Sequence, residues 1–147
     1  MILVEHLLPS ARERLETIPH DASLVEAARR LGASVDLFAV CDSEGCLIGV
    51  VTKSDVVKRI GECQGASCAA PVAAAMTSDA FCCRAGDWLH DVWSLMRENG
   101  LKNVPVIDED DRAIGIVAAR DAFEALLADV EHEESLLRDY VACVGYR

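Results

Sequence analysis

The sequence has no hydrophobic run that approaches the roughly 20 residues needed to span a bilayer. Its first residues, MILVE, lack the basic stretch that begins a secretion signal. Basic residues are few, with 14 Lys and Arg against 25 Asp and Glu, for a net charge of −11. An acidic surface repels phosphate backbones, which argues against general nucleic-acid binding. We therefore expect a cytoplasmic protein whose partners include neither membrane nor nucleic acid.

Patterns for metal binding, disulfide formation and catalysis are also missing. The chain has seven cysteines, an odd number, and no C-x-x-C pair, and its four histidines share no ligand spacing with them. No nucleophile is spaced with a base, and the acidic residues lie in turns and in the tail. We expect reduced thiols that act mostly as small buried apolar residues, no metal site and no enzymatic activity. A thiol-based redox sensor and an enzyme remain the alternatives.

What the sequence does contain is an internal repeat. Residues 48–55, IGVVTKSD, return as residues 114–121, IGIVAARD, at an offset of 66 (114 − 48). Further upstream the offset is 65, and two sets of apolar residues with the spacing of a helix face align: Leu24, Ala27, Ala28 and Leu31 with Leu89, Val92, Trp93 and Met96. The chain has 147 residues, 52% of them hydrophobic, so we expect the two copies to pack on each other as one unit.

The residue pattern of each copy predicts a helix, a strand, a turn, a second strand and a second helix. The strands are expected at residues 38–41, 48–51, 104–107 and 114–117, with turns at 42–45 and 108–111. Pro105 lies inside a predicted strand, where it lacks the N–H that a strand ladder needs. It therefore predicts an edge strand or a bulge.

The chain divides into four expected segments. They are a first repeat at 1–62, a linker at 63–75, a second repeat at 76–130 and a helical tail at 131–147. The tail continues an amphipathic pattern, and the charged residues at 131–134 are expected to interrupt it with a turn. Such a tail packs on its own domain or contacts a second subunit.

Each copy resembles a CBS domain, and the pair resembles the tandem arrangement called a Bateman module. The resemblance rests on residues 17–24 and 49–55 in the first copy, and on 76–77, 103–108 and 115–121 in the second. It implies an α+β fold, in which two β-α-β-β-α repeats form a pseudo-two-fold pair, followed here by the helical tail. It also implies a homodimer and a stand-alone regulatory module whose regulated protein is unknown.

The resemblance further implies an adenosine-containing ligand in the clefts between repeats: AMP, ADP, ATP, S-adenosylmethionine or NAD, with AMP or ATP foremost. The family's ligand signature is glycine, two apolar residues, Thr or Ser, two variable residues and Asp. Gly49, Thr52 and Asp55 match it in full.

The resemblance also assigns roles to the residues around this signature. Asp55 would accept hydrogen bonds from both ribose hydroxyls, and Thr52 and the helix N–H groups would face the phosphate. Lys53 or Ser54 would add a donor. Thr17 and Ile18 would lie along the adenine. A structural explanation stays open, because Thr52-x-x-Asp55 is also a variant of the capping box that begins a helix.

The second copy departs from the signature, because Ala118 stands where the first copy has Thr52. Gly115 and Asp121 remain, so Asp121 contacts a ribose or only complements the helix dipole. Arg120 is a candidate phosphate donor or an exposed helix residue. We expect unequal sites, with the first site holding the nucleotide better.

Lys102 and Asn103 precede the strand of Pro105, and all three are candidates for a cleft, although Lys102 and Asn103 also suit a solvated loop. The sequence thus predicts a regulatory sensor that binds an adenosine ligand. The alternative is a non-catalytic interaction scaffold with vestigial nucleotide sites.

Overall fold

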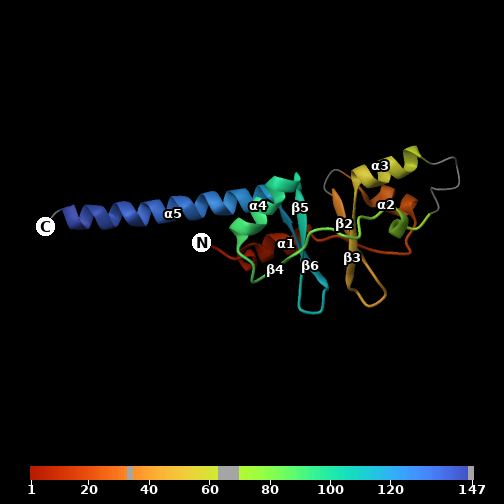
Figure 1. Ribbon diagram of the computed structural model, residues 1–147, viewed down its shortest axis with the longest axis horizontal. Coiled ribbons are helices and arrows are strands. Elements are labelled where there is room, and N and C mark those ends of the chain that lie inside the picture. Colours follow the sequence, from red (N-terminus) through yellow and green to blue (C-terminus); the bar gives the residue numbers. More distant parts are fainter. Residues whose placement is uncertain (33–34, 63–69, 146–147) are drawn as a thin grey trace.

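The computed structural model describes residues 1–32, 35–62 and 70–145, and describes side chains as far as residue 141. Two three-stranded sheets stand side by side, one from each repeat, and a long helix projects from the second (Figure 1). The linker residues 63–69, with Cys63 and Cys68, lie outside the described residues.

The first repeat has the element order expected of it. Its elements are β1 (Thr17–Pro19), α2 (Leu24–Arg30), β2 (Leu37–Cys41), β3 (Leu47–Thr52) and α3 (Lys53–Gly61). Strand β2 lies in the centre of the sheet, parallel to β1 and antiparallel to β3. Helix α2 begins at Ser23, whose hydroxyl accepts a hydrogen bond from the Glu26 N–H at 3.1 Å.

The second repeat has the same topology. Its elements are β4 (Cys83–Arg84), α4 (Leu89–Asn99), β5 (Asn103–Ile107), β6 (Ala113–Ala118) and α5 (Ala119–Gly145). Strand β5 is central, parallel to β4 and antiparallel to β6. The α+β class and the β-α-β-β-α repeats are thus confirmed.

Short segments that precede each repeat pack on the other one. Before the first repeat come η1 (Val4–Leu7) and α1 (Leu8–Arg14), and before the second comes η3 (Val72–Ala74). Val4 and Leu7 are buried in the core of the second repeat, whereas Val72 is buried in the core of the first. Each core is therefore completed by a segment that lies before the other repeat in the chain.

A third, smaller core joins the two repeats. Leu37 and Val50 of the first repeat pack there with Ile116 of the second, and Leu15 and Ala80 flank them. All three central side chains are less than a tenth exposed. The repeats consequently share a buried apolar contact, as expected for one unit.

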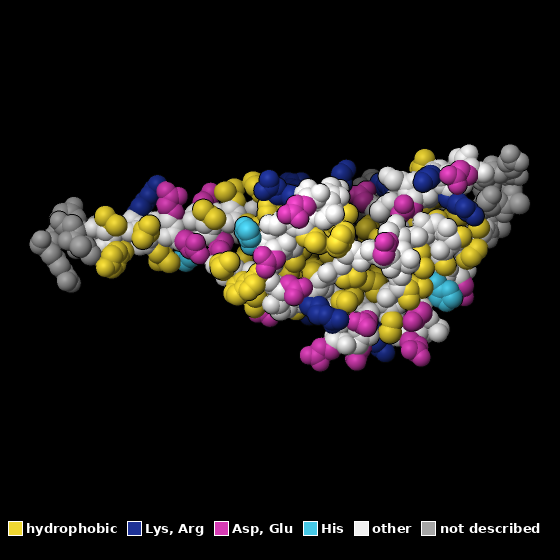
Figure 2. Space-filling model, in the orientation of Figure 1, with side chains coloured by type: hydrophobic (Ala, Val, Ile, Leu, Met, Phe, Trp, Pro, Cys, Tyr) yellow, Lys and Arg dark blue, Asp and Glu magenta, His cyan; other side chains and the backbone are white. Residues whose placement is uncertain are grey.

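The helix α5 differs from the expectation for the C-terminal tail. It is continuous from Ala119 to Gly145, so the predicted turn at 131–134 is wrong. Glutamate is a good helix former, no Gly or Pro precedes Gly145 within the helix, and Arg138 bonds Glu134 one turn away at 2.7 Å. Beyond residue 130 the helix also leaves the body, with apolar side chains spaced along it (Figure 2). The tail residues 131–141 are all exposed, and Glu133 among them pairs with the Met1 amino group at 3.0 Å.

Pro105 also differs from the expectation, because it lies in the central strand β5 and not at an edge. The strand β4 pairs only with Val106 and Ile107, so its ladder stops just short of the proline. A bulge does occur, but one step later, between Val106 and Ile107. No helix in the described part of the chain combines the length and apolarity needed to cross a bilayer.

Candidate functional site

The start of α3 is built by a capping box. The Thr52 hydroxyl accepts a hydrogen bond from the Asp55 N–H at 3.2 Å, and Asp55 Oδ2 accepts one from the Thr52 N–H at 3.0 Å. The structural explanation of Thr52 and Asp55, a capping box that begins α3, is therefore present in the structure. Asp55 Oδ1 has no such bond to the described residues, and it is left for a further donor.

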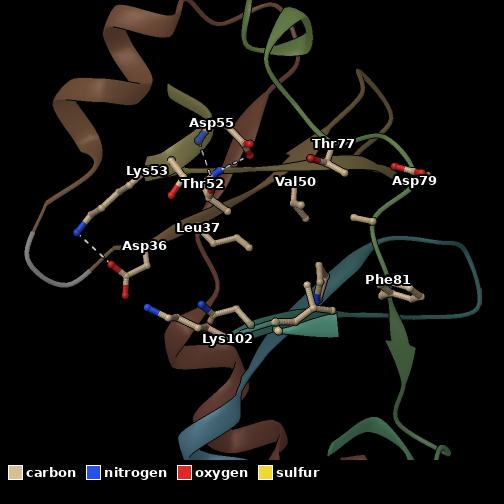
Figure 3. Close-up of a pocket in the computed structure, with 16 residues that line it drawn as sticks. Asp36, Leu37, Val50, Thr52, Lys53, Asp55, Thr77, Asp79, Phe81 and Lys102 are labelled. Atoms are coloured by element: carbon tan, nitrogen blue, oxygen red, sulfur yellow. Dashed lines mark hydrogen bonds and ion pairs between the residues drawn. The ribbon is translucent and has the colours of Figure 1, made fainter. Parts of the chain in front are cut away.

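A cleft of about 650 Å³ opens directly beside this helix start (Figure 3). Its lining comes from both repeats and from the segment before β4: Asp36, Leu37, Val50, Thr52, Lys53, Ser54, Asp55, Thr77, Asp79, Ala80, Phe81, Gly100, Leu101, Lys102, Asn103 and Pro105. Six residues expected from the sequence meet here, namely Thr52, Lys53, Asp55, Lys102, Asn103 and Pro105.

The charges in the cleft nearly balance. Three carboxylates, on Asp36, Asp55 and Asp79, face two ammonium groups, on Lys53 and Lys102. Lys53 is already paired with Asp36 at 3.0 Å. Lys102 lies across the cleft from Asp55 in Figure 3, and no ion pair joins it to the residues that the structure describes. Lys102 is thus the cation best placed for an incoming anion.

The walls of the cleft are apolar. Leu37, Val50 and Pro105 are buried. Phe81 also lines the cleft, and 44% of its surface is exposed. A flat aromatic group fits against such surfaces, while Asp55 and the first N–H groups of α3 provide a polar end. The cleft therefore suits a ligand with an aromatic part, a hydroxyl-bearing part and a small anionic part.

The second signature is engaged by the protein itself. Asp121 accepts two hydrogen bonds from the Arg14 guanidinium, at 2.5 Å from Nε and 3.1 Å from Nη2. These bonds raise the pKa of Arg14 above its usual value, which holds the side chain cationic. Arg120 is exposed and pairs with Glu124 at 3.2 Å, which is the arrangement of a solvated helix residue. Ala118 is buried beneath them.

The two signature glycines allow neighbouring segments to pack closely on the strands β3 and β6. A Cβ at Gly49 would lie 2.8 Å from the carbonyl oxygen of Thr77, and one at Gly115 would lie 2.8 Å from the Cβ of Ala11. Both contacts are too short to tolerate, so each glycine admits the chain that packs on its strand. Neither glycine lines the cleft.

These contacts are equivalent in the two repeats, but the charges at equivalent positions differ. At the offset of 65, Ala11 corresponds to Met76 (76 − 11) and Arg14 to Asp79 (79 − 14). Met76 and Thr77 lie against Gly49 as Ala11 lies against Gly115. The residue equivalent to Arg14 in the first site is thus Asp79, whose carboxylate cannot pair with Asp55 as Arg14 pairs with Asp121.

Other expected residues lie outside the cleft. Thr17 is exposed on β1, and Ile18 is buried in the core of the first repeat. Sequence reasoning missed Asp36, Asp79 and Phe81. The repeat offers one signal for Asp36, because at the offset of 66 it occupies the position of Lys102 (102 − 36).

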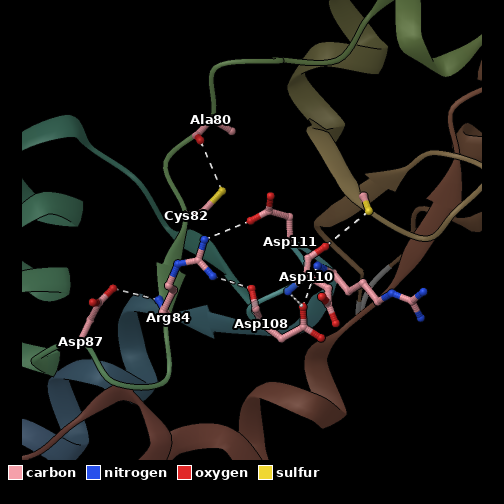
Figure 4. Close-up of polar contacts among 9 residues, drawn as sticks. Ala80, Cys82, Arg84, Asp87, Asp108, Asp110 and Asp111 are labelled. Carbon is pink, nitrogen blue, oxygen red and sulfur yellow. Dashed lines mark hydrogen bonds and ion pairs between the residues drawn. The ribbon is translucent and has the colours of Figure 1, made fainter.

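The acidic turn after β5 is a structural feature (Figure 4). The Asp108 carboxylate accepts hydrogen bonds from the N–H groups of Asp110 and Arg112. Arg84 donates to both the Asp108 carbonyl and the Asp111 carboxylate.

The described residues contain no group of three or more potential metal ligands. In the same part of the chain Cys41, Cys46, Cys82 and Cys83 are free, and burial raises the pKa of the Cys83 thiol to about 12.

Comparison with known proteins decides the family. The family model of the CBS domain matches twice, at residues 4–62 and 72–128. The chain belongs to the CBS-domain family. The two matches take up most of its length and form a CBS pair.

Solved CBS proteins have the same fold. A CBS-domain containing protein from Agrobacterium tumefaciens is 28% identical, with a TM-score of 0.71 over 84% of this chain and 92% of that one. The CBS-pair protein CBSX2 from Arabidopsis thaliana is 22% identical, with a TM-score of 0.74 over 88% of this chain and 97% of that one. The chain therefore has the fold of solved CBS pairs.

Relatives found by sequence are about as similar to this chain. An uncharacterized 17.7 kDa protein from Acidianus ambivalens is 27% identical over 118 residues, which cover 80% of this chain and 70% of that protein. Inosine-5'-monophosphate dehydrogenase from Methanocaldococcus jannaschii is 29% identical over 106 residues. That match covers 71% of this chain but only 20% of the enzyme.

Proposed function

We propose that this CBS pair is a non-catalytic sensor, which binds an adenosine-containing ligand between its repeats and reports occupancy to a partner protein. The observation that carries the proposal is the meeting of Thr52 and Asp55 with Lys102, Asn103 and Pro105 of the other repeat in one cleft. Solved relatives support the ligand class. One structure of CBSX2 contains AMP, and another CBS pair, 22% identical, contains 5′-methylthioadenosine and S-adenosyl-L-methionine.

In this proposal, different cleft residues contact the ribose, the adenine and the phosphate of the ligand. Asp55 Oδ1 accepts hydrogen bonds from the ribose, while Oδ2 remains bonded to the Thr52 N–H. The adenine lies among Leu37, Val50 and Phe81, and the phosphate or its equivalent lies toward the start of α3 and Lys102. A ligand held this way contacts both repeats, so it stabilises the arrangement in which they are close.

The charges of the cleft favour a ligand with little negative charge. With three carboxylates and two lysines, each phosphate beyond the first adds repulsion that no further cation in the cleft offsets. We therefore expect AMP and S-adenosylmethionine to bind more tightly than ATP. A reversed order would contradict this assignment of the phosphate end.

The test is thermal unfolding and titration calorimetry of the wild type and Asp55→Asn with AMP, ATP and S-adenosylmethionine. A ligand at 100 times its dissociation constant stabilises the folded state by about 2.7 kcal/mol, which gives a visible shift in midpoint. Asparagine keeps the acceptor for the Thr52 N–H but loses the charge and one acceptor oxygen. We expect an unchanged midpoint without ligand and an affinity at least about tenfold lower, because a hydrogen bond to a charged group contributes about 1.5–3 kcal/mol.

The matched control is Asp121→Asn, the same change at the same place in the second repeat. It should leave the affinity of the cleft near Asp55 unaltered. A scaffold without ligand is the second candidate function, because the capping box engages one oxygen of Asp55 and Arg14 engages both oxygens of Asp121 from within the chain. A panel in which no adenosine ligand moves the midpoint or binds would favour the scaffold over the sensor.

A further inference from the structure

The outer half of α5 projects from the body of the protein, and Glu133 at its inner end pairs with the Met1 amino group at 3.0 Å. Every residue from 131 to 141 is exposed, and the helix extends well beyond both sheets (Figure 1). A 27-residue helix is about 40 Å long, so a large part of it projects into solvent. An isolated helical segment of this kind is marginal in water, because packing supplies most of the stability of a protein helix.

The projecting helix is not polar all round. Phe123, Leu127, Val130, Leu137 and Val141 follow one another at spacings of four, three, seven and four residues. These are the core positions of a heptad repeat, broken only by Glu134. All five side chains are exposed, from 47% at Leu127 to 64% at Leu137. Figure 2 shows apolar side chains along the helix, so the stripe is open to a partner.

The stripe is continuous with the body of the protein. At its inner end the ring of Phe123 packs on Trp93 of α4, with 5.6 Å between ring centroids. Leu136 and Tyr140 widen the stripe near its outer end and are 56% and 68% exposed. An apolar surface of this extent, rimmed by charges, is characteristic of an interaction site.

The charges beside the stripe indicate its occupant. Arg138 is the only Lys or Arg between residues 121 and 141, and it flanks the stripe on the same side as Glu131. In an antiparallel pair of identical helices, these flanking positions face each other, so Arg138 of each copy meets Glu131 of the other. The same arrangement places Glu134 opposite Leu137, whereas a parallel pair would place Glu134 against its own copy. Two-fold symmetry would form the favourable contact twice.

We propose that α5 packs against the α5 of a second copy of this chain, as an antiparallel two-helix coiled coil along Leu127, Val130, Leu137 and Val141 of the stripe. This interface is independent of the ligand site, since none of its residues lines the cleft. It leaves both repeats of each copy accessible.

The experiment is sedimentation velocity of the full chain over a wide range of concentration. The wild type should form a dimer that dissociates on dilution. Leu137→Glu should raise the dimer dissociation constant about 30-fold or more, as for a central interface residue. Leu137 is 64% exposed on the projecting part of α5, so tryptophan emission should show an unchanged fold. Ser135→Glu adds the same charge to the same turn on the polar face and should leave the dimer intact. A monomeric wild type, or a dimer unaffected by Leu137→Glu, would overturn the proposal.

The orientation is tested by charge reversal. Arg138→Glu should weaken the dimer about threefold for each symmetric pair, the size of an exposed ion pair. Adding Glu131→Arg should restore it, because the two changed residues face each other only in the antiparallel arrangement. Restoration by Glu133→Arg instead would indicate a parallel pair and overturn the antiparallel arrangement, as would restoration by neither change.

Discussion

At the scale of single residues, the two repeats differ most in one charge. Arg14 and Asp79 occupy equivalent positions in the two repeats, and Asp79 lines the same cleft as Asp55. Arg14 binds Asp121, while Asp79 leaves Asp55 available in an open cleft. We therefore expect one ligand for each chain, held by the first signature. The sequence had already predicted unequal sites, but from the missing hydroxyl at Ala118 and not from Arg14.

The charge difference predicts a change in stoichiometry. Removing the guanidinium in Arg14→Ala frees Asp121, so a second, weaker adenosine ligand should bind, as titration calorimetry would show. Stability should fall by no more than about 1 kcal/mol, because the pair is partly exposed and screened by solvent.

The control for this experiment is Arg97→Ala, which removes one positive charge from the exposed side of α4. Its stoichiometry should remain at one. A stoichiometry of one in Arg14→Ala as well would mean that Arg14 is not what keeps ligand from the second signature.

At the scale of elements, the strands β3 and β6 each depend on a glycine for the approach of a neighbour. Gly49 faces a backbone carbonyl and Gly115 faces the helix α1, so neither neighbour can move aside as a side-chain tip would. Both glycines belong to the ligand signature, yet neither lines the cleft. The structure assigns them to neighbouring segments.

This packing predicts that Gly49→Ala and Gly115→Ala each destabilise the fold by about 1–3 kcal/mol, as overpacking does in other cores. The measurement is the free energy of unfolding in urea. Gly86→Ala is the matched control, because a Cβ there meets nothing within 4 Å, and it should change stability by less than about 0.5 kcal/mol. Equal effects of all three substitutions would show that close packing at Gly49 and Gly115 is not the cause.

At the scale of the whole molecule, the exchange of segments makes the repeats interdependent. Val4 and Leu7 complete the second core, Val72 completes the first, and Leu37 packs between the repeats with Ile116. Loss of either repeat would expose apolar surface on the other. The molecule should thus unfold in one transition.

The tryptophans provide the test, since Trp88 and Trp93 both lie in the second repeat. Leu37→Ala alters the first repeat and should cost about 2–5 kcal/mol, the range for a buried leucine. If the repeats unfold together, the urea midpoint of tryptophan emission should fall as much as it does for Ile116→Ala in the second repeat. A midpoint unchanged by Leu37→Ala would show that the repeats unfold separately.

The sequence by itself determined the repeat, the order of strands and helices, and the position of the first signature. These features depend on local spacing and on residues a few positions apart, which the offset of 66 displays directly. The tertiary structure alone decided that Lys102 lies across a cleft from Asp55, that Arg14 binds Asp121, and that α5 continues into solvent. Each of those outcomes depends on segments far apart in the chain or on the absence of a neighbour, and local spacing contains neither.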